Sequence, residues 1–101
     1  MSQEVDDIIR RAISNKEIVE FFYHGHMRTA EPHVYGRLDG RSQLLVFQIG
    51  GGSSSGALPD WRRVQLAEVS GLRTTGQKFA GPRPNPSGRH SPFDEVLATV
   101  G

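Results

Sequence analysis

The sequence predicts a mostly β domain with an N-terminal α-helix and five antiparallel strands. Three observations indicate this fold class: an amphipathic stripe near the N-terminus, turn signals between runs of branched and aromatic residues, and an almost wholly apolar segment at 44–49. A strand that is apolar at nearly every position must be covered on both faces. We therefore expect 44–49 to be the central strand, with Leu44 and Val46 on one face and Leu45, Phe47 and Ile49 on the other.

Residues 3–14 are expected to form the helix. Ser2 is a suitable N-cap, and acids in the first turn favour the positive end of a helix dipole. Apolar residues recur at the spacing of one helical stripe, while Arg10 and Arg11 lie off it. The stripe that would cover the sheet consists of Val5, Ile8, Ile9, Ala12 and Ile13.

Three strands should follow the helix as a meander. Residues 18–23 are branched and aromatic, and a turn centred on Gly25 leads to a second strand over 27–35. Pro32 within that strand has no amide hydrogen to donate, which indicates an edge position or a bulge. Asp39-Gly40 is a strong hairpin signal that leads into the central strand.

Residues 50–56 are a glycine and serine loop. A phosphate cradle would need Gly-Lys-Ser or Gly-Lys-Thr at the start of a helix, whereas Ala57-Leu58-Pro59 follows here, so we interpret the segment as a connection. A fourth strand is expected over 61–66 and a short fifth strand over 70–75, with Phe79 packing just beyond.

The C-terminal part is predicted to be a tail. Residues 80–92 hold four prolines and no large apolar side chain, so they cannot offset their ordering entropy. Residues 93–100 have the spacing for one or two helical turns, with Val96, Leu97 and Val100 on one side. We therefore expect a domain over 1–79, a flexible proline-rich tail with a short C-terminal helix over 80–101, and a folded remainder after a cut at Phe79.

The order of these elements resembles the WYL domain family, an SH3-like five-stranded antiparallel small barrel, over roughly residues 5–79. This chain has Ser42-Gln43 in place of the family's Trp-Tyr, and Gln65 and Glu68 where arginines are expected. The matching residues are Ala12, Ile13, Tyr23, Arg28, Pro32, Gly40, Leu44, Arg62, Val64, Leu66, Val69 and Phe79.

The resemblance implies a regulatory function. WYL domains usually follow a helix-turn-helix in bacterial transcription regulators and sense a ligand, thought to be a nucleotide or single-stranded nucleic acid, through basic residues. We expect these 101 residues to leave no room for the DNA-reading part. A ligand-sensing or regulatory module without enzymatic activity is therefore expected.

Charge and aromatic residues indicate where such a ligand would bind. The formal net charge is +1, but between the acidic ends all twelve basic residues, ten of them arginine, stand against six acids. Arginine forks and aromatic faces together bind phosphates and unstacked bases, although an ordinary charged surface would have the same composition. The predicted ligand-binding residues are Tyr23, Arg28, Trp61, Arg62 and Arg63.

Other classes of protein fit less well. Without cysteine there is no disulfide or thiolate metal site, and no apolar run approaches the length of a membrane span, so we expect a cytoplasmic protein with no membrane partner. His24, His26 and, from the adjoining strand, His33 could meet at a metal, but the turn positions of His24 and His26 favour exposed side chains. No fixed-spacing catalytic signature is present, so we expect no catalytic residue, metal or cofactor. A protein interaction or homodimerisation module that uses a strand edge is the alternative.

Overall fold

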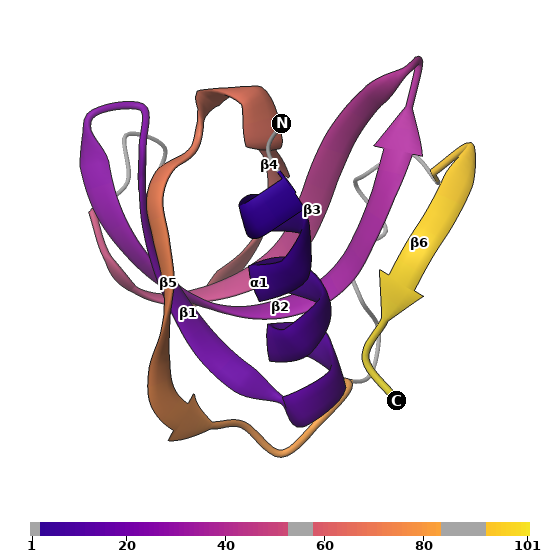
Figure 1. Cartoon of the computed structure of the whole chain (residues 1–101). Coiled ribbons are helices and arrows are strands. Elements are labelled where there is room, and N and C mark those ends of the chain that lie inside the picture. Colours follow the sequence, from indigo (N-terminus) through magenta and orange to yellow (C-terminus); the bar gives the residue numbers. More distant parts are fainter. Residues whose placement is uncertain (1–2, 53–57, 84–92) are drawn as a thin grey trace.

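The computed structural model describes residues 3–52, 58–83 and 93–101. The predicted fold class is confirmed: the described part is mostly β with an N-terminal helix, although it contains six strands instead of five (Figure 1). The elements are α1 (Gln3–Asn15), β1 (Glu17–Tyr23), β2 (His26–Leu38), β3 (Arg41–Gly51), β4 (Asp60–Gln65), the 3-10 turn η1 (Leu66–Glu68), β5 (Ser70–Lys78) and β6 (Glu95–Thr99).

All strand pairs are antiparallel, in the order β4-β3-β2-β1-β5. The meander from β1 to β4, followed by η1 and a fifth strand that returns to the side of β1, is the arrangement of an SH3-like small barrel. In Figure 1 the sheet bends strongly and α1 crosses in front of it. β1 pairs with the first part of β2 and β6 with the second part, so the long β2 carries both neighbours in succession.

Both predicted hairpin turns are present. His24 and Gly25 have φ values of 48° and 83°, and Asp39 and Gly40 have values of 53° and 76°. Two successive residues with positive φ match the right-handed twist of the flanking strands, and Asn, Asp, His and Gly tolerate this conformation best. The short loops therefore fix the register of β1 against β2 and of β2 against β3.

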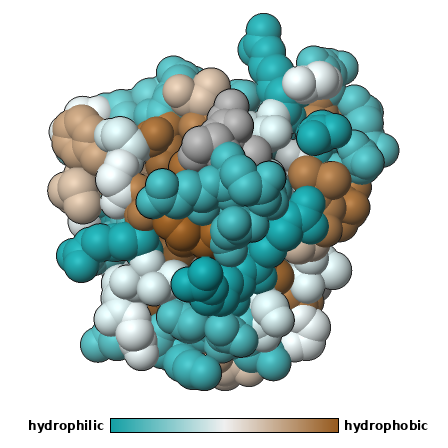
Figure 2. All heavy atoms as spheres, in the orientation of Figure 1, coloured by the Kyte–Doolittle hydropathy of each residue, from teal (hydrophilic) through white to brown (hydrophobic). Residues whose placement is uncertain are grey.

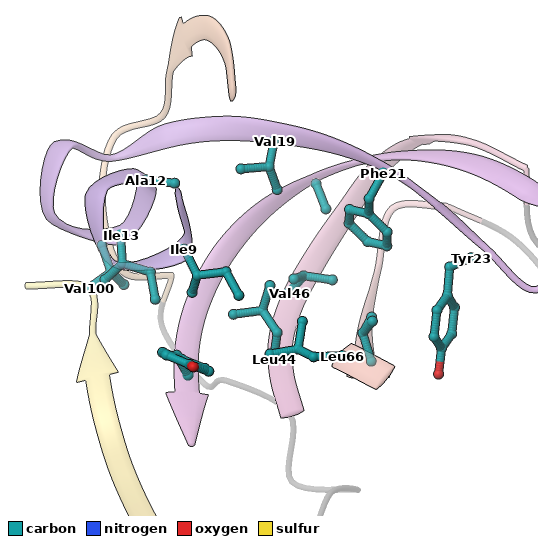
Figure 3. Packing of buried hydrophobic residues seen from close by; sticks show 13 residues of the cluster. Ile9, Ala12, Ile13, Val19, Phe21, Tyr23, Leu44, Val46, Leu66 and Val100 are labelled. Atoms are coloured by element: carbon teal, nitrogen blue, oxygen red, sulfur yellow. The ribbon is translucent and has the colours of Figure 1, made fainter. Parts of the chain in front are cut away.

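The main core lies between α1 and the sheet. Ile9, Ala12 and Ile13 of the predicted stripe are buried, and Figure 3 shows them pointing toward side chains of β1 and β3. The helix turns its charged side to water, and hydrophilic side chains dominate the view in Figure 2. The buried sheet and C-terminal members of this core are Val19, Phe21, Tyr23, Ala30, Tyr35, Leu44, Val46, Val64, Leu66 and Val100.

The opposite side of β2, β3 and β4, here called the outer face, is also covered. Arg83 donates from Nε and Nη2 to the two carboxylate oxygens of Glu31, at 2.8 and 2.9 Å, and its guanidinium lies 4.1 Å from the centre of the Phe47 ring. Phe79 packs against the buried ring of His33. The expected two-sided cover of the central strand is therefore present at Leu45 and Phe47, while Ile49 stays exposed.

Pro32 lies beside a bulge, as predicted. The register of β2 against β3 shifts between Pro32 and Val34, so His33 is the extra residue. On the other edge of β2, pairing with β1 ends at Ala30 and pairing with β6 begins at Val34. Pro32 therefore occupies the gap between two ladders, where its missing amide hydrogen costs no hydrogen bond of that edge.

The C-terminal segment is a strand, so the short helix expected over 93–100 is wrong. β6 pairs with β2, and Val100 enters the main core. The second half of β2 has unpaired backbone groups beyond the end of β1, and strand pairing satisfies them where a helix would not. Residues 80–83 lie on the domain through Arg83, and the rest of the expected proline-rich tail, 84–92, lies outside the described residues.

A polar contact links α1 to β2. Tyr35 Oη donates to Asp6 Oδ1 at 2.7 Å, and Arg10 Nε donates to the same carboxylate at 3.0 Å. The hydrogen bond from Tyr35, with support from Arg10, lowers the pKa of Asp6. Burial, with the Asp6 carboxylate beside the hydroxyl, raises the pKa of Tyr35 to about 12. The contact is therefore expected to favour an ionised Asp6 and a neutral Tyr35.

Replacing Tyr35 with Phe should lower the free energy of unfolding by about 1.5–3 kcal/mol at neutral pH, because it removes a hydrogen bond to a charged group and keeps the ring. The pKa of Asp6 is lowered from 3.8 in the folded state, so its contribution is present above 3.8 and is lost as the pH falls through the folded value. The difference between variant and wild type should thus shrink at low pH. Urea unfolding across this pH range measures it, and a difference that does not change with pH would contradict the expectation.

Candidate functional site

The five residues predicted to bind a ligand divide between the two faces of the sheet. Arg62 is opposite Val46 and shares the face of the main core, whereas Trp61 is opposite Phe47 on the outer face, together with Arg63. The five residues therefore do not form one site, because successive strand residues such as Arg62 and Arg63 point to opposite sides of a sheet. Arg62 joins Tyr23 and Arg28, and Trp61 and Arg63 form a separate group.

Arg28 is held at the hairpin end of the core. Its Nε donates to the backbone oxygen of Tyr23 at 3.2 Å, and its Nη1 donates to Oε1 of Gln48 at 3.2 Å. The guanidinium lies 5.3 Å from the centre of the Tyr23 ring. Both hydrogen-bond acceptors are neutral, and within residues 3–52, 58–83 and 93–101 the guanidinium has no ion-pair partner, although Arg28 is only 5% exposed. A buried charge without a counter-charge is costly.

A second guanidinium lies close to Arg28. Arg62 donates from Nη1 to Oδ2 of Asp60 at 2.8 Å, and its side chain is 15% exposed. Burial, and then the positive charge of Arg62, lowers the pKa of Arg28. The second carboxylate oxygen of Asp60, Oδ1, accepts a hydrogen bond from the Trp61 backbone amide at 2.8 Å. We call Arg28 and Arg62 the inner arginine pair.

Gln48 orients Arg28 of this pair, and its role was not predicted from the sequence. The side chain is completely buried, and its Nε2 donates to the backbone oxygens of Gly50 and Gly52, both at 3.0 Å. These two bonds point Oε1 toward Arg28. A polar residue that is buried in an apolar strand needs hydrogen-bond partners. The glutamine at position 48, within the apolar segment 44–49, was the sequence feature that could have indicated this role.

Tyr23 positions its neighbours and is not a free stacking surface. Its hydroxyl accepts a hydrogen bond from the Gln65 amide at 3.1 Å. The ring of His24 stacks on it, with 3.9 Å between ring centres, and Arg28 lies over it as well. His24 in turn is 2.8 Å from Oε1 of Glu68. These contacts join the β1–β2 hairpin to β4 and η1.

Trp61 and Arg63 take part in packing on the outer face. The Trp61 ring meets Phe47 edge to face, with 5.2 Å between ring centres, and it meets His33 in the same way at 4.8 Å. Arg63 donates to Oε1 of Gln43 at 2.9 Å, and its guanidinium lies 4.1 Å from the centre of the Phe93 ring. Burial lowers the pKa of Arg63. Arg63 therefore contacts the C-terminal segment through Phe93, whereas Trp61 packs against side chains of β2 and β3.

Other candidate features are sparse in the described part of the chain. No three side chains of the His, Cys, Asp and Glu types come together there in a way that could hold a metal. A shallow pocket of about 330 Å³ is lined by Gly40, Arg41, Ser42, Gln65 and Ala67. No helix among these residues has the length and apolar content to cross a membrane.

Comparison of the chain with protein-family models, with curated proteins and with solved structures finds no match. The resemblance to the WYL family therefore stays a prediction. The inner arginine pair, its supporting Gln48 and the single carboxylate of Asp60 are the features on which a functional proposal can rest.

Proposed function

We propose that this domain is a non-enzymatic module that binds an anionic ligand, a nucleotide or a single-stranded nucleic acid, at the inner arginine pair. The observation that supports this most is Arg28, which is almost fully buried and donates to two neutral oxygens. A phosphate group beside it would supply the missing counter-charge and accept charge-assisted hydrogen bonds.

Phosphate recognition is favoured over base stacking at this site. The Nη2 group of Arg28 donates to no acceptor among the described residues, so it is the group offered to a ligand. Tyr23, the predicted stacking partner, is already covered by His24 and Arg28. Arg62, which is less buried than Arg28, would contact the outer side of the same phosphate.

The matched variants Arg62→Gln and Arg63→Gln test this site. They remove the same charge from adjacent positions of β4, one beside Arg28 and the other on the outer face. We expect Arg62→Gln to weaken binding of ATP and of a short single-stranded oligonucleotide roughly tenfold or more, since a hydrogen bond to a charged group contributes about 1.5–3 kcal/mol. Arg63→Gln should change it less than about twofold.

Isothermal titration at two salt concentrations measures both affinities. Wild-type binding should weaken as salt increases, because phosphate contacts release counterions. Equal affinities of the two variants would overturn the arginine-pair site. The resemblance to WYL domains supports a sensing role in bacterial transcription regulation and, with the lack of cysteine, a cytoplasmic location, which is part of the same proposal.

A second candidate function is protein interaction, and one observation favours it. Phe22 and Met27 lie opposite each other in the β1–β2 hairpin and are 43% and 50% exposed. Ile49 of β3 is also exposed. Exposed large apolar side chains of neighbouring strands are typical of contact surfaces. Absence of ATP and oligonucleotide binding to the wild type would leave this function as the better supported one.

A further inference from the structure

The C-terminal segment from Phe93 to Val100 binds the domain through its own complete set of contacts. β6 pairs with residues 34–37 of β2, and two further backbone bonds extend the ladder: Asp94 N to Arg37 O at 2.8 Å and Val100 N to His33 O at 2.9 Å. The Asp94 carboxylate accepts from the Asp39 amide at 2.8 Å. These are the contacts by which a separate extended peptide adds a strand to a sheet edge.

Phe93 occupies a specific notch in this edge. A Cβ atom on Gly36 would lie 2.7 Å from Cγ of Phe93 and 2.5 Å from the backbone oxygen of Glu95, so only glycine leaves room for both. The guanidinium of Arg63 in β4 lies over the Phe93 ring, 4.1 Å from the ring centre. The notch therefore holds the Phe93 ring only because position 36 is glycine.

The connection to this segment is long compared with the domain. Ten residue steps separate Arg83, which is fixed on the outer face by Glu31, from Phe93. A chain of that length spans up to ~33–36 Å when extended. The largest dimension of the molecule is 29 Å. The same segment can thus reach the β2 edge of its own domain or that of a neighbouring copy.

We propose that the β2 edge with the Gly36 notch is an interaction surface for the C-terminal segment of a second copy of this chain, and that two copies exchange β6 reciprocally to form a dimer. Every contact of residues 93–100 is kept in the exchanged form, so the two forms differ mainly in the entropy of the connection. The intramolecular form has an effective concentration in the ~mM range, so exchange is expected at high protein concentration or where copies are held together.

Cysteine trapping tests the exchange in the full chain, because the sequence contains no cysteine of its own. Arg37 and Glu95 are both exposed and lie opposite each other in the β2–β6 ladder. One protein carries Arg37→Cys and the other carries Glu95→Cys. The two are mixed at ~0.5 mM, warmed to just below the melting temperature, cooled and oxidised with glutathione disulfide. A disulfide between the two different chains then reports a β6 docked on the other copy.

The control mixes the Glu95→Cys protein with a Glu4→Cys protein, whose cysteine lies at an exposed position of α1. Its disulfide yield measures random collision between chains. We expect the mixed disulfide, at twice the 11.1 kDa chain mass on a non-reducing gel, to exceed the control yield by roughly tenfold or more. Adding Gly36→Val to the Arg37→Cys chain should reduce the yield to the control level, because the segment of the Glu95→Cys chain then finds an open notch only on its own chain, and a thermal melt confirms that the variant is folded. A yield equal to the control for the unmodified pair, or no loss with Gly36→Val, would overturn the proposal.

Discussion

A chain that ends at Phe79 is expected to lose its cooperative thermal transition, contrary to the folded remainder that the sequence alone indicated. The cut removes Arg83 and with it the ion pair to the carboxylate of Glu31. It also removes Val100 from the core and the β6 ladder from β2. Burial of one such side chain contributes about 1.5–3 kcal/mol. Because small domains have only ~5–15 kcal/mol of stability in total, the remainder should be largely unfolded.

Circular dichroism melts of the truncated and full-length chains measure this loss. A full-length Arg83→Gln variant separates the ion pair from the strand, and it should keep a cooperative melt at a lower temperature. Val96→Ser is the matched control within β6, since Val96 is exposed and its replacement should change the melting temperature little. A truncated chain that melts cooperatively near the wild-type temperature would show that residues 80–101 are dispensable for folding.

The elements that depend on local pattern could be predicted from the sequence. The helical stripe, the Asp39-Gly40 turn and the doubly apolar central strand each act through neighbouring residues, and each is present in the structure. The central strand even indicated that something must cover its second face. The cover is the segment around Phe79 and Arg83, together with Phe93.

The position of β6 could not be predicted in the same way. Val96, Leu97 and Val100 fit one side of a short helix, and an isolated segment of that length has no strong preference. Its conformation is decided by the unpaired second half of β2, which lies about sixty residues earlier in the chain. Local sequence contains no information about that partner.

The candidate site shows a different limit. Alternation along β4 separates Arg62 from Trp61 and Arg63, and this division follows from the period of a strand alone. Arg28 lies in β2 and Arg62 in β4, so their approach depends on how both strands pair with β3, the strand that carries Gln48. Residue type alone supplied the hypothesis of an arginine site, whereas deciding which arginines lie together required the register of three strands.

Replacing Ile9 with Asp should strongly destabilise the fold. Ile9 is 1% exposed and packs at the centre of the core between the helix and the sheet (Figure 3), so the new carboxylate would be buried without a partner. We expect the free energy of unfolding to fall by about 3–5 kcal/mol, the range of severe core lesions. Ser14→Asp introduces the same charge at an exposed position of α1 and should cost less than about 1 kcal/mol. Urea unfolding of both variants measures the difference, and equal midpoints would show that α1 does not depend on this contact for docking.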